Sequence, residues 1–237
     1  MRARDVSSRG AYATGVLGCS GDRIPHPGGT ELTLHAVGLA GLQRGSLILD
    51  IGCGAGATVM LLRSHGLNAK GIDLSFTPAS GIADLYCQCA SAGHLPFPAE
   101  SFDAVLAECS LSVMEDPLGV LRECARVLRP GGKIILCDVY ARNNEEIGAV
   151  RTPNSESISG VLVREELDAW LRHTGFHVTC FEDHSQALRQ AMAQFIFDHD
   201  SPAELWGTCD SSHQIDRIAQ AMKRIRAGYF ILTAVRV

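Results

Sequence analysis

The chain has 237 residues, of which 46% are hydrophobic and 20% are charged. This composition is typical of a globular protein with a sizeable core, and it excludes a disordered chain, a collagen-like fibre and a small disulfide scaffold. The formal net charge of −5 argues against nucleic acid as a partner, because proteins that bind phosphate backbones normally carry an excess of Lys and Arg.

No uninterrupted apolar run reaches the length of a membrane span, and residues 1–10 lack the apolar core of a signal peptide. The nine cysteines are an odd number, and most of them lie inside apolar runs where a small buried hydrophobe would serve. We therefore expect a reduced, cytoplasmic protein. Cys87 and Cys89 resemble half of a thiolate metal site, but no Cys-x-x-Cys or His pair completes it, so we expect core cysteines and no metal.

Short apolar runs alternate with segments of helical periodicity through most of the chain. Asp116 followed by Pro117 is a strong helix start, because the carboxylate caps the first turn and proline tolerates the first helical position. The alternation predicts an α/β fold, a mostly parallel sheet covered by helices. The expected strands are 47–51, 69–73, 85–89, 104–108, 133–139, 176–182 and 229–237, and the expected helices are 30–41, 58–65, 117–128, 164–174, 185–197 and 212–226.

A glycine-rich bend, residues 50–56, follows the first expected strand. Glycines let the backbone turn sharply and approach a ligand, and the start of the next helix offers unpaired N–H groups. Asp73 ends the next expected strand, about 20 residues further on, where a carboxylate can accept hydrogen bonds from ribose hydroxyls. Together these features predict a site for an adenosine-containing cofactor.

The identity of that cofactor depends on the charge beside the bend. Gly52, Gly54 and Ala57 also fit the G-x-G-x-x-G/A pattern of dinucleotide-binding loops. However, Asp50 places a carboxylate where a pyrophosphate needs no further negative charge. A cationic sulfonium with an α-amino group tolerates this carboxylate far better.

Four successive motifs resemble those of the class I S-adenosylmethionine-dependent methyltransferases, in particular the ubiquinone/menaquinone-type small-molecule branch. The resemblance covers about residues 30–139, whereas residues 164–237 carry no sharp motif. It implies a methyltransferase that uses S-adenosyl-L-methionine and acts on a small-molecule acceptor. It also implies a Rossmann-like, doubly wound, seven-stranded, mostly parallel sheet with an antiparallel last strand. The motifs occupy residues 49–56, 71–75, 95–103 and 128–133.

The resemblance assigns roles to residues at the methionine end of the cofactor. Gly52 and Gly54, with Cys53 between them, would line this end, and Asp50 would fix the loop and the amino group. Glu108, at the end of the fourth expected strand, would face the methionine portion and the substrate.

At the adenosine end, the resemblance implies that Asp73 holds the ribose and that Leu74 packs on the adenine. Ala92 would approach the adenine edge. Relatives commonly carry an Asp four residues before the Leu-Pro-Phe-Pro stretch, where this chain has Ser91, which can make one hydrogen bond but supplies no charge.

The connection between Asp73 and Leu85 has only eleven residues, among them Pro78 and Gly81, so we expect no full helix there. One flank of the sheet is then expected to be covered by the N-terminal segment or by a second subunit, in a possible homodimer. Residues 1–29 are expected to form this segment, with a possible role as a lid, and residues 30–237 a single methyltransferase domain.

The candidate catalytic residues are Glu108 and His184. His184 follows Glu182 at the end of the sixth expected strand and could act as a general base for a hydroxyl or phenol acceptor. The alternative, which we favour, is a histidine at a helix start bonded to a neighbouring carboxylate. Residues 182–206 are expected to line the acceptor pocket. Two other functions stay open: an NAD(P)-dependent oxidoreductase and a catalytically inactive cofactor-binding subunit.

Overall fold

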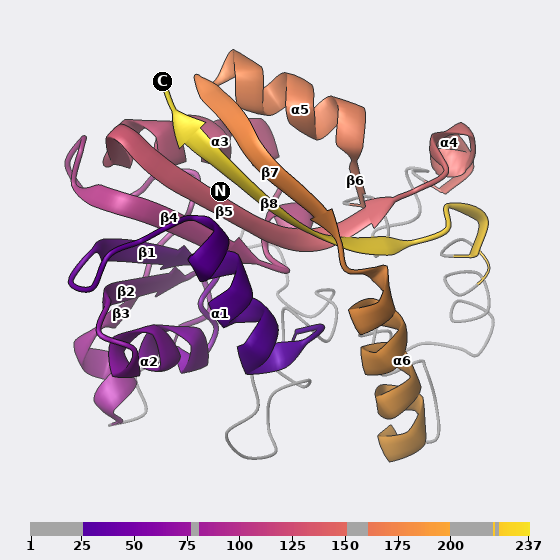
Figure 1. Cartoon of the computed structure of the whole chain (residues 1–237), viewed down its shortest axis with the longest axis horizontal. Helices are drawn as coiled ribbons and strands as arrows, with labels where there is room; N and C mark the ends of the chain where they lie inside the picture. Colours follow the sequence, from indigo (N-terminus) through magenta and orange to yellow (C-terminus); the bar gives the residue numbers. More distant parts are fainter. Residues whose placement is uncertain (1–25, 77–80, 151–160, 200–219, 221–222) are drawn as a thin grey trace, which may run out of the picture.

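A computed structural model describes residues 26–76, 81–150, 161–199, 220 and 223–237. Within these ranges the strands form one eight-stranded sheet of order β3-β2-β1-β4-β5-β8-β7, with β6 beside β5 (Figure 1). β8 runs antiparallel to its neighbours β5 and β7, and all other pairs are parallel. The strands are β1 (Leu47–Ile51), β2 (Asn68–Asp73), β3 (Cys87–Cys89), β4 (Phe102–Glu108), β5 (Leu128–Ala141), β6 (Leu162–Val163), β7 (Phe176–Asp183) and β8 (Gly228–Arg236).

Helices cover both faces of the sheet (Figure 1). Helices α1, α2 and α6 contribute to the core on one face, and α3 and α5 to the core on the other. Among the described helices, none combines the length and apolar character needed to cross a bilayer. The helices are α1 (Gly29–Leu39), α2 (Ala57–Ser64), α3 (Pro117–Val127), α4 (Ile147–Val150), α5 (Arg164–His173) and α6 (Ser185–His199), with 3-10 turns η3 (Ile82–Leu85), η4 (Leu111–Val113) and η5 (Asn144–Glu146).

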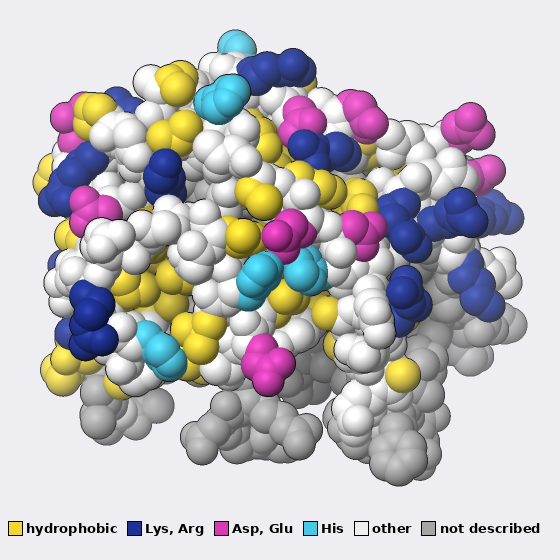
Figure 2. Space-filling view, viewed as in Figure 1, with side chains coloured by type: hydrophobic (Ala, Val, Ile, Leu, Met, Phe, Trp, Pro, Cys, Tyr) yellow, Lys and Arg dark blue, Asp and Glu magenta, His cyan; other side chains and the backbone are white. Residues whose placement is uncertain are grey.

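The central strand β1 shows why these segments form a buried parallel sheet. Ile48 packs into the core on one face, whereas Leu49 and Ile51 pack into the core on the other, and all three are fully buried. A strand covered on both faces reads as a continuous apolar run, as this one does. On the outer surface, acidic and basic side chains are interspersed over the face shown in Figure 2.

The α/β fold and its strand order agree with the sequence-based expectation, with differences at the ends of elements. The sheet has eight strands rather than seven, because the two-residue β6 pairs with Tyr140 and Ala141 at the end of β5. A two-residue strand is too short to produce a periodic pattern. Most of the expected helix 212–226 lies outside the described residues.

Two helix starts show what local sequence does and does not determine. Asp116 caps α3 as expected, since its Oδ1 accepts a hydrogen bond of 2.9 Å from the amide of Gly119. The expected helix 30–41, for which the hydroxyl of Thr30 is the natural cap, begins one residue earlier than predicted: α1 starts at Gly29 and its N-cap is Gly28, in the left-handed region at φ +79°. Glycine adopts this conformation without steric cost. The turn therefore leads into the helix at Gly28, and Thr30 lies inside the first turn of α1.

Candidate active site

The bend between β1 and α2 is held against β2 by backbone hydrogen bonds. The amides of Gly52 and Cys53 both donate to the carbonyl of Ile72, at 2.8 and 3.0 Å. Gly52 has φ +79°, and a Cβ there would lie 2.5 Å from Cβ of Ser110. Only glycine fits this position without strain, because it has both the left-handed backbone and a close neighbour.

Asp73, at the end of β2, is tied to the same bend. Its Oδ2 accepts a 3.1 Å hydrogen bond from the amide of Gly54, and its Oδ1 accepts bonds from the amide and hydroxyl of Ser75 at 2.8 and 2.7 Å. The adjacent Leu74 is 55% exposed, an unusual state for a large apolar side chain. The structure thus gives Asp73 a structural role in shaping the bend, which the sequence alone did not indicate.

Asp50, at the end of β1, is a buried carboxylate that lacks a full set of partners. The residue is 2% exposed, and its Oδ2 makes no hydrogen bond to any described residue. Burial raises the pKa of Asp50 well above its usual range, and the nearby charges of Glu108, Cys87 and Asp73 raise it further. Burying a carboxylate oxygen without a hydrogen-bond partner costs free energy. A cationic ligand beside Asp50 would offset this cost by pairing with the oxygen.

Glu108, at the end of β4, is the centre of a buried hydrogen-bond network. Its Oε1 accepts from the hydroxyl of Thr33 at 3.0 Å, and its Oε2 accepts from that of Thr58 at 3.2 Å. His26 Nε2 lies 3.3 Å from the same Oε2, and the side chains of His26 and Glu108 are each only 5% exposed. Burial lowers the pKa of His26, but the charge and hydrogen bond of Glu108 outweigh it, so that the pKa is raised.

We refer to Asp50, Asp73 and Glu108 as the buried acidic cluster, in which Asp50 and the side chain of Glu108 are buried and Asp73 is partly exposed at its edge. They come from the carboxyl ends of the neighbouring strands β1, β2 and β4. The charges of Glu108 and Asp73 both raise the pKa of Asp50, so the three carboxylates act on one region. Such a region repels a pyrophosphate and suits the positive sulfonium and ammonium groups of S-adenosylmethionine. The residues present therefore fit this cofactor.

The sequence missed the partners of Glu108, namely His26, Thr33 and Thr58. Thr33 and Glu108 are 75 positions apart, so no local spacing connects them. Thr58 carried a weak signal, because it lies in the first turn of the helix that follows the glycine bend. His26 lies in the turn before α1, where its carbonyl accepts a 3.1 Å hydrogen bond from the amide of Gly29, and no spacing links it to Glu108.

The other expected cofactor residues lie at the same end of the sheet in different environments. Ala92 is buried, whereas Ser91 is exposed and accepts a 3.3 Å hydrogen bond from the amide of Gly93. Cys53 faces β2: a Cβ at Gly71 would lie 2.6 Å from its sulfur. The expectation that Cys87 and Cys89 are both core residues is half wrong, because Cys89, at the end of the edge strand, is exposed.

His184 lies outside the Glu108 network. Its Nε2 is 2.8 Å from Glu182 Oε2, which agrees with the favoured interpretation of a helix-start histidine bonded to a carboxylate. His35 Nε2 lies 2.7 Å from the same oxygen. His35 and Thr33 are two positions apart on α1, or about 200° around its axis. His184 and Glu108 therefore contact opposite sides of α1.

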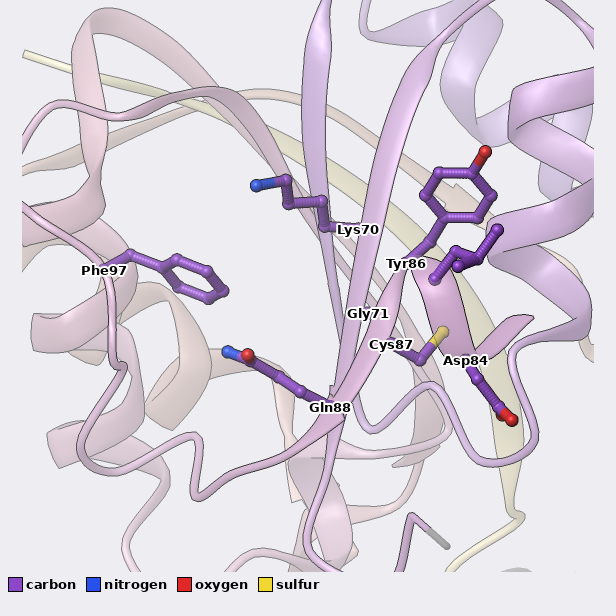
Figure 3. Close-up of a pocket in the computed structure, with 8 residues that line it drawn as sticks. Lys70, Gly71, Asp84, Tyr86, Cys87, Gln88 and Phe97 are labelled. Atoms are coloured by element: carbon purple, nitrogen blue, oxygen red, sulfur yellow. The ribbon is translucent and has the colours of Figure 1, made fainter. Parts of the chain in front are cut away.

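A cavity of about 310 Å³ lies elsewhere, at the β2–β3 edge of the sheet (Figure 3). One side of these strands carries Lys70, Gln88 and Phe97, and the other carries Tyr86 and Cys87. The cavity therefore extends around β3, the edge strand of the described sheet. In the described part of the connection before it, residues 74–76 and 81–86, the only helix is the four-residue η3, as expected from its length. None of the glycines of the bend lines this cavity.

Comparisons with known proteins agree with this geometry. Residues 49–136 match the family model described as a methyltransferase domain. The O-methyltransferase resE of Aspergillus sclerotiorum is 31% identical over 209 residues, which cover 81% of this chain and 76% of the relative. The chain belongs to the class I S-adenosylmethionine-dependent methyltransferase family. The 27-O-demethylrifamycin SV methyltransferase of Amycolatopsis mediterranei is 33% identical over 175 residues, covering 68% of this chain and 64% of that enzyme.

Solved structures, a methyltransferase among them, share the fold. Haemonchus contortus phosphoethanolamine N-methyltransferase 2, in complex with S-adenosyl-L-methionine, has a TM-score of 0.68 at 18% identity, covering 95% of this chain and 56% of that one. The [4+2]-cyclase SpnF has the same TM-score at 28% identity, covering 87% and 80%. The protein is an S-adenosylmethionine-dependent methyltransferase, as the motifs predicted, and the comparisons give no support to the oxidoreductase alternative.

Proposed function

We propose that this methyltransferase methylates a hydroxyl oxygen of a small organic molecule and that its buried acidic cluster holds the positively charged end of the cofactor. Two of the relatives reported above are named for O-methylation. The observation that carries the proposal is the convergence of three carboxylates, one of which, Asp50, has a buried oxygen without a partner among the described residues.

The cofactor residues of this proposal are those implied by the motifs. The backbone of Gly52, Cys53 and Gly54 would border the methionine end, close to Asp50. The open space around Gly54, where a Cβ would meet nothing within 4 Å, supports close approach by a ligand. When bound, S-adenosylmethionine would supply a methyl group made electrophilic by its positive sulfur; the acceptor oxygen would bond to the methyl carbon as the sulfur–carbon bond breaks and S-adenosylhomocysteine leaves.

At the adenosine end, Asp73 would accept hydrogen bonds from the ribose and Leu74 would pack on the adenine. The exposed apolar surface of Leu74 supports this role. Ala92 and Ser91 would border the adenine edge, where Ser91 replaces the acid common in relatives and offers a hydroxyl in its place.

A hydroxyl acceptor must lose its proton during methyl transfer. Two observations support Glu108 and His26 as the pair that takes it up: they are buried together, and the charge of Glu108 also acts on Asp50. The Glu108 carboxylate also stabilises the protonated imidazole, and so holds the pKa of His26 above its usual range and favours the form that has accepted a proton. His184 contacts Glu182 instead, and its role as a base stays a prediction.

The acceptor itself would lie toward α6 and the end of β7, which carry the described part of residues 182–206. Positioning the acceptor and excluding water can supply on the order of 7–11 kcal/mol of the barrier reduction. Such a pocket needs no further catalytic group beyond a proton acceptor.

A direct test uses methyl-labelled cofactor with three sets of small acceptors that carry hydroxyl, amine or thiol groups on matched scaffolds. We expect label only in methyl ethers formed from the hydroxyl set. Transfer to amines or thiols in preference to hydroxyls would contradict the proposed acceptor atom. Failure to label any acceptor in a broad metabolite extract would favour the cofactor-binding subunit without catalysis.

Cofactor placement is tested separately by calorimetric binding of S-adenosylhomocysteine. We expect Asp73→Ala to weaken binding by about 10- to 100-fold, because hydrogen bonds to a charged acceptor are worth about 1.5–3 kcal/mol. Asp73→Asn is the matched control: it keeps an oxygen for the amide of Gly54 and should retain the bend, with an intermediate loss. Unchanged binding in Asp73→Ala would show that the ribose lies elsewhere.

We also propose a reducing, cytoplasmic location and an assembly in which a second subunit covers the β3 edge. The seven cysteines among the described residues are all free thiols, which supports the location. Leu85, 74% exposed on η3 beside the open edge strand, supports the second subunit. Light scattering of the wild type and of Leu85→Glu tests the assembly: a dimer that the substitution splits is expected, and a monomeric wild type would contradict it.

A further inference from the structure

Three potential metal ligands from distant parts of the chain meet on the outer side of α1. His35 lies on α1, Glu182 at the end of β7, and His184 immediately before α6. One ligand atom of each lies within 4.8 Å of the others. Both Nε2 atoms lie close to the same oxygen, Glu182 Oε2, at 2.7 Å for His35 and 2.8 Å for His184. We refer to these residues as the outer cluster.

We propose that the outer cluster binds one divalent transition-metal ion of the zinc type. Two imidazoles and one carboxylate form a ligand set that zinc and related ions use, with positions left for water or another ligand. With metal–ligand bonds of about 2.0–2.1 Å, tetrahedral ligand atoms lie roughly 3.3 Å apart. The observed contacts therefore need to open by only about half an ångström at each histidine.

The arrangement of the rings supports a common target. The two imidazoles meet edge to face, with centroids 5.6 Å apart and planes at 67°, so that they do not stack on each other. Both instead direct a nitrogen toward the carboxylate between them. Because 147 positions separate His35 from Glu182, this geometry depends on the packing of α1 beside β7.

Solvent access allows an ion to reach the cluster. The side chains are 46%, 33% and 25% exposed for His35, Glu182 and His184. Figure 2 shows histidine side chains next to acidic ones near the middle of the face viewed.

A bound ion would fasten α1 to the end of β7. The opposite side of the same helix presents Thr33 to Glu108. The ion would thus hold in place the helix that supports the catalytic network, without entering the methyl transfer step. This inference rests on the outer cluster alone and holds for any methyl acceptor.

The test is a calorimetric titration of chelator-treated full-length protein with Zn²⁺, under reducing conditions. We expect one equivalent to bind with micromolar or tighter affinity and to raise the melting temperature, since a ligand that binds only the folded state stabilises it. His35→Ala and His184→Ala should each weaken binding at this site at least tenfold. His173→Ala, at an exposed histidine that ends α5, is the matched control and should bind as the wild type does.

Because cysteines also bind zinc, the coordinating atoms must be identified. X-ray absorption of the 1:1 complex should show nitrogen and oxygen ligands and no sulfur. Sulfur ligands, equal affinities in wild type and both histidine variants, or the absence of binding at micromolar concentrations would each overturn the proposal. Binding of S-adenosylhomocysteine by the metal-free variants verifies that they are folded, and it can fail independently if the proposed cofactor site is wrong.

Discussion

The buried acidic cluster and the outer cluster both lie where strands end, yet they shift the pKa of a carboxylate in opposite directions. Asp50 is almost fully buried beside other acids, and burial raises its pKa. Glu182 is one-third exposed between two histidines, which lower its pKa. The fold thus keeps one carboxylate in an unfavourable environment and the other in a satisfied one. An unfavourable environment persists where a ligand of opposite charge offsets it, which is the physical argument for a cationic cofactor beside Asp50.

Asp138, on β5, is an intermediate case. It is as buried as Asp50, but it accepts hydrogen bonds from the amide and hydroxyl of Ser112 and from the amide of Val139. Burial raises its pKa to about 6, and these donors limit the increase. Burial therefore sets the direction of the shift, and the number of donors sets how far it goes.

The largest expected effect of a substitution is at Glu108. Glu108→Gln keeps the size of the side chain but removes the charge, and because its amide nitrogen can only donate, the hydrogen bond with either Thr33 or Thr58 must reverse its direction. We expect kcat to fall by about 10²- to 10⁴-fold, the usual contribution of a proton acceptor. Because the carboxylate raises the pKa of His26, the acid limb of the remaining pH–rate profile should move to lower pH.

Steady-state kinetics between pH 5 and 9 provide this measurement. Glu100→Gln, an exposed substitution before the opposite end of β4, is the control and should leave both kcat and the profile unchanged. An active Glu108→Gln variant with an unshifted profile would remove Glu108 and His26 from the proposed proton transfer.

A second effect concerns the bend that borders the buried acidic cluster. Gly52→Ala forces a side chain into the left-handed region and to within 2.5 Å of Cβ of Ser110. We expect the free energy of unfolding to fall by roughly 2–5 kcal/mol, the sum of backbone strain and overpacking. Gly54→Ala has the same backbone strain but no close neighbour, so urea denaturation should show a smaller loss. Equal losses would show that packing on Ser110 is unimportant.

The third prediction is a pH dependence of stability at Asp138. Its folded pKa of about 6 lies above the ordinary value of 3.8 for an Asp side chain, so the folded state binds the proton more tightly than the unfolded state. This contribution to stability is present below about pH 4 and is lost as the pH rises to about 6, by on the order of 3 kcal/mol. Asp138→Asn should flatten this part of the curve in urea denaturation at pH 4, 5, 6 and 7. Parallel curves for the two proteins would mean that Asp138 titrates normally.

The smallest effect is expected in the outer cluster without metal. The pKa of Glu182 is lowered, so its contribution to stability is present above pH 4.5 and disappears as the pH falls through the folded value. For so exposed a group, Glu182→Gln should reduce the free energy of unfolding by less than about 1 kcal/mol at pH 7. If Glu182→Gln lowered the free energy of unfolding as much as Gly52→Ala does, the outer cluster would contribute as much stability as the bend beside the buried acidic cluster, and the contrast between the two clusters would be wrong. Chelated protein must be used, so that a bound ion does not add its own stabilisation.

Expectations from the sequence were most accurate where a feature depends on neighbouring residues. The cap at Asp116, the order of strands and helices, and the lack of room for a helix before β3 all follow from local chemistry and chain length. Expectations failed where a neighbour in space decides. Cys89 is exposed at the end of the edge strand β3, whereas Cys87 on the same strand is buried, and β6 exists because the end of β5 offers it a partner.

By itself, the sequence determined the α/β architecture, the glycine bend and the acids around it, because periodicity and backbone preferences act over a few residues. Only the tertiary structure decided that Glu108 meets His26, that one oxygen of Asp50 meets no partner among the described residues, and that His35 reaches Glu182. These contacts arise from the packing of whole helices on a sheet, and residues that meet in this way share no spacing along the chain.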